Sequence, residues 1–261
     1  MQISLTYLSF SNIFYKILMV IIMQRYFVDK IDDRFILSEN DFHHIKNVMR
    51  IKENDNIICV YDNRSYLCKI QYTFNTYQII VEEEVTKDVE LNKEVLLYQA
   101  LIKNDKFDLV VQKATELGTS KIIPTIFNRS IIKIDSSKKD NKLSRYEKIV
   151  KEACEQSHRQ SMPMVCDYIN VKKIKLDDDT LGLMAYENNG DFTSLHNTLK
   201  DISSYKKIAI VIGPEGGFCD DEVNYLTSIG FKNVSLGKRI LRSETASMFL
   251  LSVVSHYLEG M

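Results

Sequence analysis

The strongest constraint on the fold is a fully apolar strand that runs directly into a glycine-rich turn. Residues 208–212 read IAIVI, and the sequence GPEGG at 213–217, called the GPEGG turn below, follows at once. In an open α/β sheet, ligands bind beyond the carboxyl ends of the strands. Adjacent glycines let the backbone turn sharply and approach a ligand closely. The pattern predicts a ligand site here, but it matches neither the glycine fingerprint of dinucleotide-binding proteins nor the P-loop.

The chain divides into two parts with different patterns. Residues 23–90 contain short β-branched and aromatic runs at 25–29, 56–62, 65–74 and 77–85, and one helix at 38–50 that Ser38 caps. They predict a small, mostly β barrel. From residue 91 to 261 strands and amphipathic helices alternate, which predicts an α/β domain with a parallel sheet. The strands are expected at 94–102, 121–127, 181–187, 206–213 and 233–237, and the helices at 106–118, 143–160, 219–230 and 245–260.

Composition excludes several classes of protein. The chain has 34 Lys and Arg against 35 Asp and Glu, so it cannot be cationic over its whole surface. Residues 129–159 nevertheless hold about nine basic and five acidic residues, which predicts a local positive patch. The five cysteines are odd in number and lack a CxxC pair, which indicates neither a disulfide framework nor a metal site and favours the reducing cytoplasm.

The first 22 residues differ in composition from the rest of the chain. They carry one charge, Lys16, and their apolar run at 17–23 is too short to span a bilayer. No basic segment precedes that run, so a signal peptide fits poorly. The preferred interpretation is that 1–22 is a leader outside the native protein, which would start at Met23. The alternative is an extra helix or a membrane-surface segment.

A second strand end carries charged residues. After the strand at 233–237 comes a loop with Lys238, Arg239 and Arg242, and then Ser243 or Glu244 opens a hydrophobic helix. Cations, a carboxylate and a helix N-terminus together suit polar groups of a ligand. The strand end at 183–187 supplies a third loop, and a parallel sheet could bring all three together.

Several segments together resemble one known family. GPEGGF, LGKRILRSETA, KNDKFDLVVQKATELG, EACEQSHRQ, MQRYFV and HHIKNVMR are similar to the RsmE family of 16S ribosomal RNA uridine-N3 methyltransferases, of the SPOUT class. The resemblance implies a two-domain α+β protein, with an N-terminal PUA-like β barrel and a C-terminal α/β SPOUT domain that contains a deep trefoil knot. It also implies S-adenosylmethionine as cofactor, a homodimer, 16S rRNA in the 30S subunit as substrate, and no membrane.

The site residues follow from the three loops and from this resemblance. Arg242 is expected to stabilise negative charge on uracil, and Glu244 is a candidate base. The cofactor is expected to contact Leu183, Met184, Ala185, Tyr186, Glu187, Ile212, Gly213, Pro214, Glu215, Gly216, Gly217, Leu236, Gly237, Ile240, Leu241, Arg242, Thr245 and Ala246. RNA contacts are expected at Arg25, His43, His44, Arg50, Lys103, Lys106, Arg129, Gln156 and Arg159.

Two other interpretations stay open at this point. The chain could be an RNA-binding protein of the same fold without catalysis, although the GPEGG turn and the sequence LRSETA are both intact. It could also be a SPOUT methyltransferase that acts on a different RNA site. Binding of S-adenosylmethionine separates the first interpretation from an enzyme, and mapping of the modified nucleoside separates the second.

Overall fold

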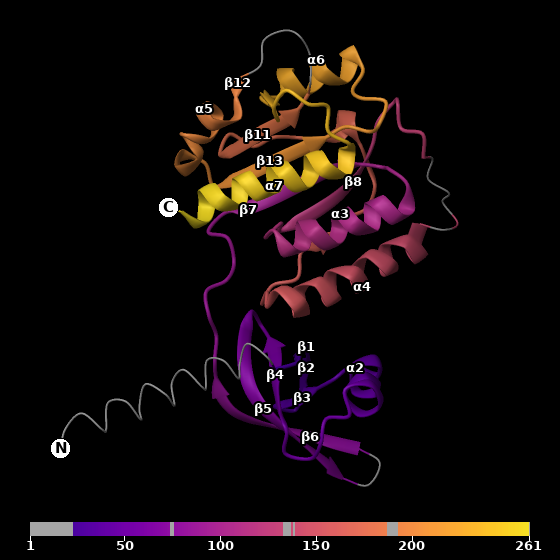
Figure 1. The fold of residues 1–261 in the computed structure, drawn as a ribbon, viewed down its shortest axis with the longest axis vertical. Coiled ribbons are helices and arrows are strands. Elements are labelled where there is room, and N and C mark those ends of the chain that lie inside the picture. The colour runs from indigo at the N-terminus through magenta and orange to yellow at the C-terminus, as the bar shows by residue number, and fades with distance from the viewer. Residues whose placement is uncertain (1–22, 74–75, 133–136, 138, 187–192, 261) are drawn as a thin grey trace, which may run out of the picture. The chain divides into compact units, whose positions relative to one another are not determined.

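The computed structural model describes residues 23–260, except 74–75, 133–136, 138 and 187–192 (Figure 1). The predicted leader at 1–22 therefore lies outside the described residues. The chain forms two compact units. The first runs up to Val89 and includes His158–Ser161, and the second contains Glu90–Ser157 and Met162–Met261. The predicted boundary at residue 90 lies beside this division, but the return of His158–Ser161 to the first unit was not predicted.

The first unit is built from strands around a mostly aliphatic core, against which several tyrosines pack. Its main sheet has the order β1 (Arg25–Phe27), β4 (Asn56–Tyr61), β5 (Arg64–Thr73) and β6 (Thr76–Glu84). A separate hairpin pairs β2 (Asp29–Ile31) with β3 (Arg34–Ile36). Among the described residues no ladder joins β6 to β1, so closure into a barrel stays a prediction.

The predicted helix of this unit begins where the sequence places its cap. The hydroxyl of Ser38 accepts a hydrogen bond from the backbone N–H of Asp41 at 3.1 Å and caps α2 (Glu39–His43). The predicted continuation to Arg50 as a single α-helix is wrong. From His44 to Val48 the chain winds as a π-helix, η1, and Arg50 has a positive φ of 52°. The wider turn follows from the Met49 N–H, which bonds to the carbonyl of His44.

The second unit confirms the predicted α/β fold with a parallel sheet. The strand order is β10-β8-β7-β13-β11-β14-β12, β9 also pairs with β8, and all these ladders are parallel. The trefoil knot stays a prediction. The strands are β7 (Glu94–Ala100), β8 (Lys121–Ile126), β9 (Met164–Val165), β10 (Ile169–Asn170), β11 (Thr180–Ala185), β12 (Thr193–Ser194), β13 (Lys207–Ile212) and β14 (Lys232–Ser235).

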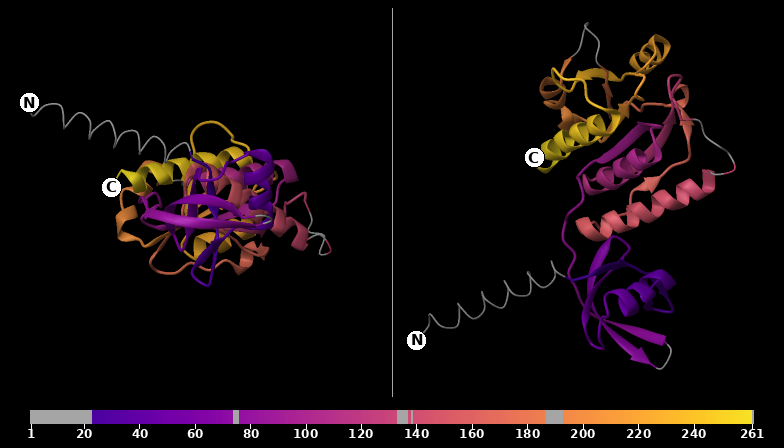
Figure 2. Two further views of the ribbon diagram at one scale, coloured as in Figure 1. Left: turned by 90° about the horizontal axis from the view of Figure 1, so that it is seen from below. Right: turned by 45° about the vertical axis from the view of Figure 1, so that its right-hand side comes forward.

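Helices cover both faces of this sheet. Helices α3 (Asn104–Glu116) and α7 (Ser243–Glu259) lie side by side on one face (Figure 2). On the other face, Leu226 of α6 (Asp220–Ser228) packs in a cluster with Ala209 and Val211 of β13. The remaining helices are α4 (Lys139–Ser157), α5 (Leu195–Leu199), η3 (Val171–Lys173) and η4 (Ile202–Ser204). No helix among the described residues is long and apolar enough to cross a membrane.

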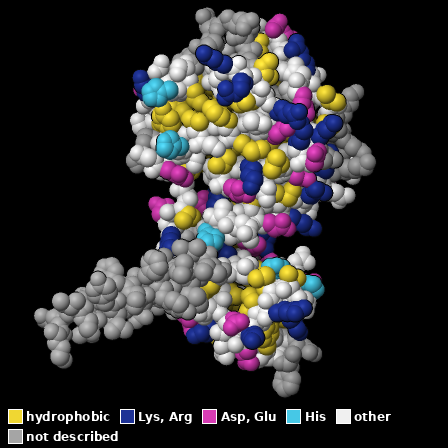
Figure 3. Space-filling model, in the orientation of Figure 1, with side chains coloured by type: hydrophobic (Ala, Val, Ile, Leu, Met, Phe, Trp, Pro, Cys, Tyr) yellow, Lys and Arg dark blue, Asp and Glu magenta, His cyan; other side chains and the backbone are white. Residues whose placement is uncertain are grey.

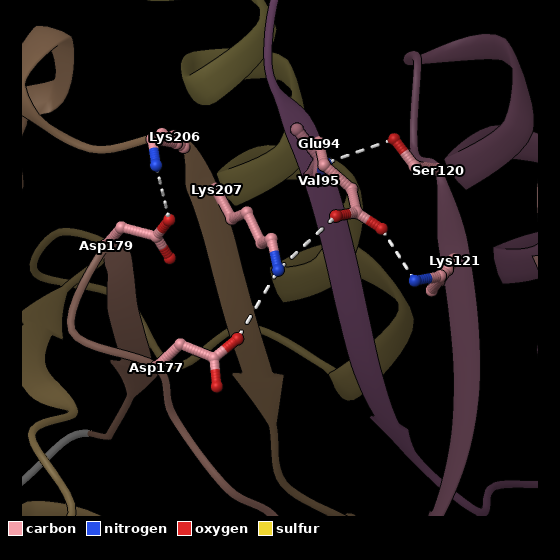
Figure 4. Close-up of polar contacts among 8 residues, drawn as sticks. All are labelled: Glu94, Val95, Ser120, Lys121, Asp177, Asp179, Lys206 and Lys207. Atoms are coloured by element: carbon pink, nitrogen blue, oxygen red, sulfur yellow. Dashed lines mark hydrogen bonds and ion pairs between the residues drawn. The ribbon is translucent and has the colours of Figure 1, made fainter.

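The amino ends of the strands are joined by charged side chains (Figure 4). Glu94 at the start of β7 bonds to Lys121 at 2.7 Å and lies 4.0 Å from Lys207. Lys207 also pairs with Asp177 at 3.3 Å, and hydrogen bonding with Asp177 raises the pKa of this lysine. These pairs are exposed, so they fix the alignment of neighbouring strands more than they stabilise the fold. The amino edge is thus tied together by ion pairs.

Helix α4 ends earlier than the sequence predicts. The prediction placed Gln156 and Arg159 on one face of a helix at 143–160, but the helix stops at Ser157. His158 has a positive φ of 62°, which turns the chain out of the helix. Gln156 is exposed whereas Arg159 is only 5% exposed, so the two side chains do not share one open face.

A buried carboxylate joins the loop after β8 to the start of α6. Glu222 is fully buried. Its Oε1 accepts a hydrogen bond from the backbone N–H of Asn128 at 2.7 Å, and its Oε2 accepts one from the N–H of Cys219 at 2.9 Å. Phe127 and Phe218 pack edge to face beside these bonds, with ring centroids 5.4 Å apart. The end of the GPEGG turn is therefore fixed to a loop about ninety residues earlier in the chain.

We predict that Glu222→Gln lowers the free energy of unfolding by about 1–3 kcal/mol, because an amide NH2 cannot accept a hydrogen bond and leaves a buried N–H unpaired. Chemical denaturation measures the change. The matched control is Asp221→Asn, because the Asp221 side chain is 77% exposed on the same helical turn. Equal stability of the two variants would contradict the role given to Glu222.

Candidate functional site

A cavity of about 510 Å³ opens at the carboxyl ends of β11, β13 and β14. Its walls come from the three strand-end loops that the sequence analysis selected. They are Ala185 at the end of β11 with Tyr186 after it, the GPEGG turn after β13, and a basic loop at 236–242 that leads into α7. This is the opposite edge of the sheet from the ion pairs of Figure 4. The parallel sheet thus brings the three loops together, as expected.

Most of the predicted cofactor residues lie in this wall. They are Ala185, Tyr186, Ile212, Gly213, Pro214, Glu215, Gly217, Leu236, Ile240, Leu241, Arg242 and Ala246. Leu183 and Met184 do not line the cavity, because both are fully buried in the interior of β11. Gly216, Gly237 and Thr245 also fall outside its lining. Glu187 lies outside the described residues.

Several wall residues were not predicted from the sequence. Phe218, Asp220, Val234 and Ser243 line the cavity, and so does Arg129, which was expected to contact RNA. Asp220 and Ser243 each begin a helix directly after a strand-end loop. That position was a usable signal, because the N-terminus of such a helix faces the same edge as the loop.

The GPEGG turn depends on close packing at its first glycine. A Cβ on Gly213 would come within 2.8 Å of the Phe218 ring, which is too close for any other residue. The N–H of Gly217 bonds to the carbonyl of Pro214 at 2.9 Å, and Gly217 has a positive φ of 68°. Phe218 also meets Tyr186 edge to face at 5.7 Å. The turn is therefore a compact, packed structure.

Arg129 holds this turn from the side of β8. Its Nη1 donates to the carbonyl of Phe218 at 2.9 Å and to that of Gly216 at 3.3 Å. A Cβ on Gly216 would lie 3.0 Å from Arg129 Cβ and 3.1 Å from its carbonyl oxygen. Gly216 is therefore needed for the approach of Arg129. Arg129 lies in the cavity wall and is exposed, and its contact with RNA stays a prediction.

The helix α7 begins at the cavity. Arg242 is the residue before its first turn, is extended at φ −67° and ψ 154°, and is exposed while it lines the cavity. Ser243 donates from its hydroxyl to the carbonyl of Gly213 at 2.7 Å. The start of α7 is thus bonded to the start of the GPEGG turn, and Arg242, the residue before α7, is exposed in the cavity wall.

The contacts of Glu244 do not suit its predicted role as a base. Its Oε1 pairs with Lys106 of α3 at 2.9 Å, and the residue does not line the cavity. Burial acts to raise the pKa of Glu244, but hydrogen bonds from Lys106 and from its own N–H, with the charges of Lys106 and Arg242, lower it overall. A carboxylate with a lowered pKa is a poor proton acceptor. The structure therefore favours Glu244 and Lys106 as partners of each other, not as base and RNA contact.

The predicted RNA contacts fall into two groups. His43, Arg50, Lys103 and Gln156 are exposed, and His44 is half-buried with its Nδ1 at 3.1 Å from the Tyr26 hydroxyl. Arg25 and Arg159, by contrast, are 8% and 5% exposed. Arg25 donates to the Ser65 hydroxyl at 2.8 Å, and burial lowers the pKa of its guanidinium. Side chains this buried offer little surface to phosphate, so RNA contacts at Arg25 and Arg159 stay predictions that their burial does not favour.

Comparison with known protein families identifies both parts of the chain. Residues 89–255 match the model of an RNA methyltransferase domain, and residues 37–82 match that of an RNA methyltransferase PUA domain. The first match covers most of the α/β unit, and the second covers α2, η1, β4, β5 and most of β6 in the first unit.

Individual relatives match over nearly their whole length. Ribosomal RNA small subunit methyltransferase E of Bacillus subtilis is 35% identical over 91% of this chain and 98% of its own, and that of Mesomycoplasma hyopneumoniae is 36% identical over 88% and 98%. The crystal structure of the Neisseria gonorrhoeae enzyme of this name, bound to S-adenosylmethionine, superposes with a TM-score of 0.78. It is 28% identical and covers 90% of this chain and 97% of its own. The predicted resemblance is confirmed: the chain belongs to the ribosomal RNA small subunit methyltransferase E family.

Proposed function

We propose that this chain transfers the methyl group of S-adenosylmethionine to N3 of a uridine in 16S rRNA of the small ribosomal subunit. The observation that carries the proposal is the cavity at the carboxyl edge, where the GPEGG turn and Arg242 share one wall. The Neisseria relative, whose crystals hold S-adenosylmethionine, supports the cofactor, and the names of the relatives support the RNA substrate.

The cavity wall suits the chemistry of this cofactor. Ile212, Leu236 and Leu241 supply apolar surface for an adenine ring, and the backbone of the GPEGG turn supplies hydrogen-bonding groups beside it. Glu215 and Asp220 supply carboxylates that would accept hydrogen bonds from ribose hydroxyls or an amino group. When bound, the sulfonium supplies an activated methyl group, so the protein's main task is alignment.

Arg242 is the residue best placed to assist the chemistry. Uracil N3 carries a proton, and loss of that proton puts negative charge on the neighbouring carbonyl oxygens. A guanidinium fixed beside the cavity stabilises such charge as it develops. Arg242 is exposed and lines the cavity, and the hydroxyl of its neighbour Ser243 donates to the carbonyl of Gly213. Glu244, in this proposal, keeps α7 and α3 in place through Lys106.

Arg242→Ala should reduce methyl transfer by on the order of 10²-fold or more, because one donor to a developing oxyanion is lost. Affinity for S-adenosylmethionine should stay near the parent value. Transfer of labelled methyl groups to 30S subunits and to naked 16S rRNA, followed by mapping of the modified nucleoside, measures the reaction. The matched control is Arg239→Ala, because Arg239 is exposed in the same loop and does not line the cavity.

The same assay separates the proposed function from its alternatives. Cofactor binding without transfer to either form of RNA would favour a binding protein without catalysis. A methyl group on another nucleoside would assign a different target. A preference for the assembled subunit over naked RNA would support the 30S subunit as the natural substrate.

The first unit is proposed to contact RNA through its exposed cations. Arg50 follows η1 on the surface and is exposed. Arg50→Ala should weaken RNA binding and reduce the slope of log affinity against log salt by about one, the effect of losing one phosphate contact. Arg64→Ala is the control, because Arg64 is exposed in the same unit but already pairs with Glu84 at 3.2 Å. An unchanged slope for Arg50→Ala would remove Arg50 from the RNA surface.

The chain is also proposed to form a homodimer through α7. Figure 3 shows hydrophobic side chains gathered on the face of the α/β unit that carries this helix. Phe249 of α7 is 41% exposed, and Ile240 before the helix is 89% exposed. Analytical ultracentrifugation should give the mass of two chains, and Phe249→Glu should shift it toward one. A single-chain mass for an active parent sample would contradict the dimer.

A further inference from the structure

We propose that Gln99 is a positioning residue, which holds the GPEGG turn and the start of α7 in fixed relation through hydrogen bonds buried beneath the cavity. The inference rests on the proposed function. In it, Gln99 fixes the distance between the cofactor wall and Arg242. Gln99 does not line the cavity.

Gln99 is an unusual residue for its place. It stands near the end of β7, between Tyr98 and Ala100, and is fully buried. Burial of an amide is costly unless hydrogen bonds replace those to water. Side chains alternate along a strand, so Gln99 points away from the face that carries Ala100 and the cluster around α6. It therefore faces the side of the sheet that α7 covers.

The hydrogen bonds of this amide connect it to the carboxyl edge of the sheet. Its Nε2 donates to the Ser243 hydroxyl at 3.0 Å and to the carbonyl of Ala100 at 3.2 Å. Its Oε1 accepts from the Ser247 hydroxyl, which also lies 2.9 Å from the Ser243 carbonyl. Ser243 in turn donates to the carbonyl of Gly213 at 2.7 Å. Both the nitrogen and the oxygen of the amide are thus hydrogen-bonded, and Ser243 links Gln99 to Gly213.

This chain of bonds joins three elements that the sequence keeps far apart. Gln99 and Ser243 are separated by 144 residues, and Ser243 and Gly213 by 30. Gly213 is the first residue of the GPEGG turn, and Arg242 directly precedes Ser243. A shift of Gln99 would therefore change the distance between the cofactor wall and the guanidinium. The effect on transfer should be large, because misplacement of reacting groups by about 1 Å can cost on the order of 10²-fold in rate.

The test compares Gln99→Met with a variant at another buried polar residue, one that is bonded to neither the GPEGG turn nor the start of α7. Met has a similar length but removes the amide bonds. The control is Thr125→Val, because Thr125 is fully buried in β8 and its hydroxyl bonds to its own strand at Ile123, at 2.9 Å. Gln99→Met should lower kcat by at least about tenfold and weaken binding of S-adenosylmethionine in calorimetry. Thr125→Val should leave both near the parent values.

Hydrogen exchange supplies a readout that overall stability alone would not produce. In Gln99→Met, exchange should rise selectively in peptides that cover 213–217 and 242–247, whereas a general loss of stability would raise it across the sheet. Ser247→Ala removes the donor to Gln99 Oε1 and keeps a helix-forming residue, so it serves if Gln99→Met folds poorly. It should show the same selective exchange, and its effects should not add to those of Gln99→Met.

The outcomes distinguish this inference from the proposed function. If the parent transfers methyl groups and both Gln99→Met and Ser247→Ala match Thr125→Val in kcat, cofactor affinity and exchange, Gln99 has no positioning role. If the parent binds no S-adenosylmethionine, the proposed function and this inference fail together. A uniform rise in exchange with unchanged kcat would assign Gln99 to general stability and overturn the inference.

Discussion

The site depends on polar side chains that bond to both sides of one glycine turn. On the side of β8, the carboxylate of Glu222 and the guanidinium of Arg129 bind the turn and the residues that follow it. On the side of α7, Ser243 binds the carbonyl of Gly213. A turn after an exposed strand end would otherwise be mobile, since loops have few packed contacts of their own. Bonds from two directions let five residues with three glycines form a defined wall.

The two edges of the parallel sheet serve different purposes. The amino edge holds exposed ion pairs among Glu94, Lys121, Lys207 and Asp177, which align strands without enclosing any space. The carboxyl edge holds glycines, apolar side chains and helix N-termini around a cavity. Strand direction produces this difference, because in a parallel sheet every strand delivers its following loop to the same edge. The ligand cavity and the ion pairs that join the strands are therefore separated by the length of the strands.

Charge acts locally in this protein. The total of 34 basic and 35 acidic residues conceals how differently individual cations are used. Arg129 donates to two backbone carbonyls, Lys106 pairs with Glu244, and Arg25 donates to the Ser65 hydroxyl. Arg50 and Arg242 remain exposed, one in each unit. The burial and the partners of each cation, more than the net charge, decide which of them can meet an anionic substrate.

Much of the fold was predictable because its signals are local. The alternation of strands and helices, the apolar run before the GPEGG turn and the cap at Ser38 all depend on residues a few positions apart. Twelve of the predicted cofactor residues line the cavity for the same reason, since all but Ala246, which lies in the first turn of α7, stand at the end of a strand or in the loop that follows it. Where the local signal was weak, prediction failed: nothing in the spacing at 38–50 distinguished an α-helix from the π-helix that begins at His44.

Other features were decided only by the tertiary structure. The burial of Arg25 and Arg159, the pairing of Glu244 with Lys106 and the place of Arg129 in the cavity wall all depend on partners distant in the chain. Gln99 is the clearest case, because its bond to Ser243 spans 144 residues and no motif marks it. By itself the sequence determined which segments become strands, helices and turns, through periodicity and turn chemistry. Which polar groups meet in the interior was decided by packing, because only the assembled sheet shows which donors and acceptors water can no longer reach.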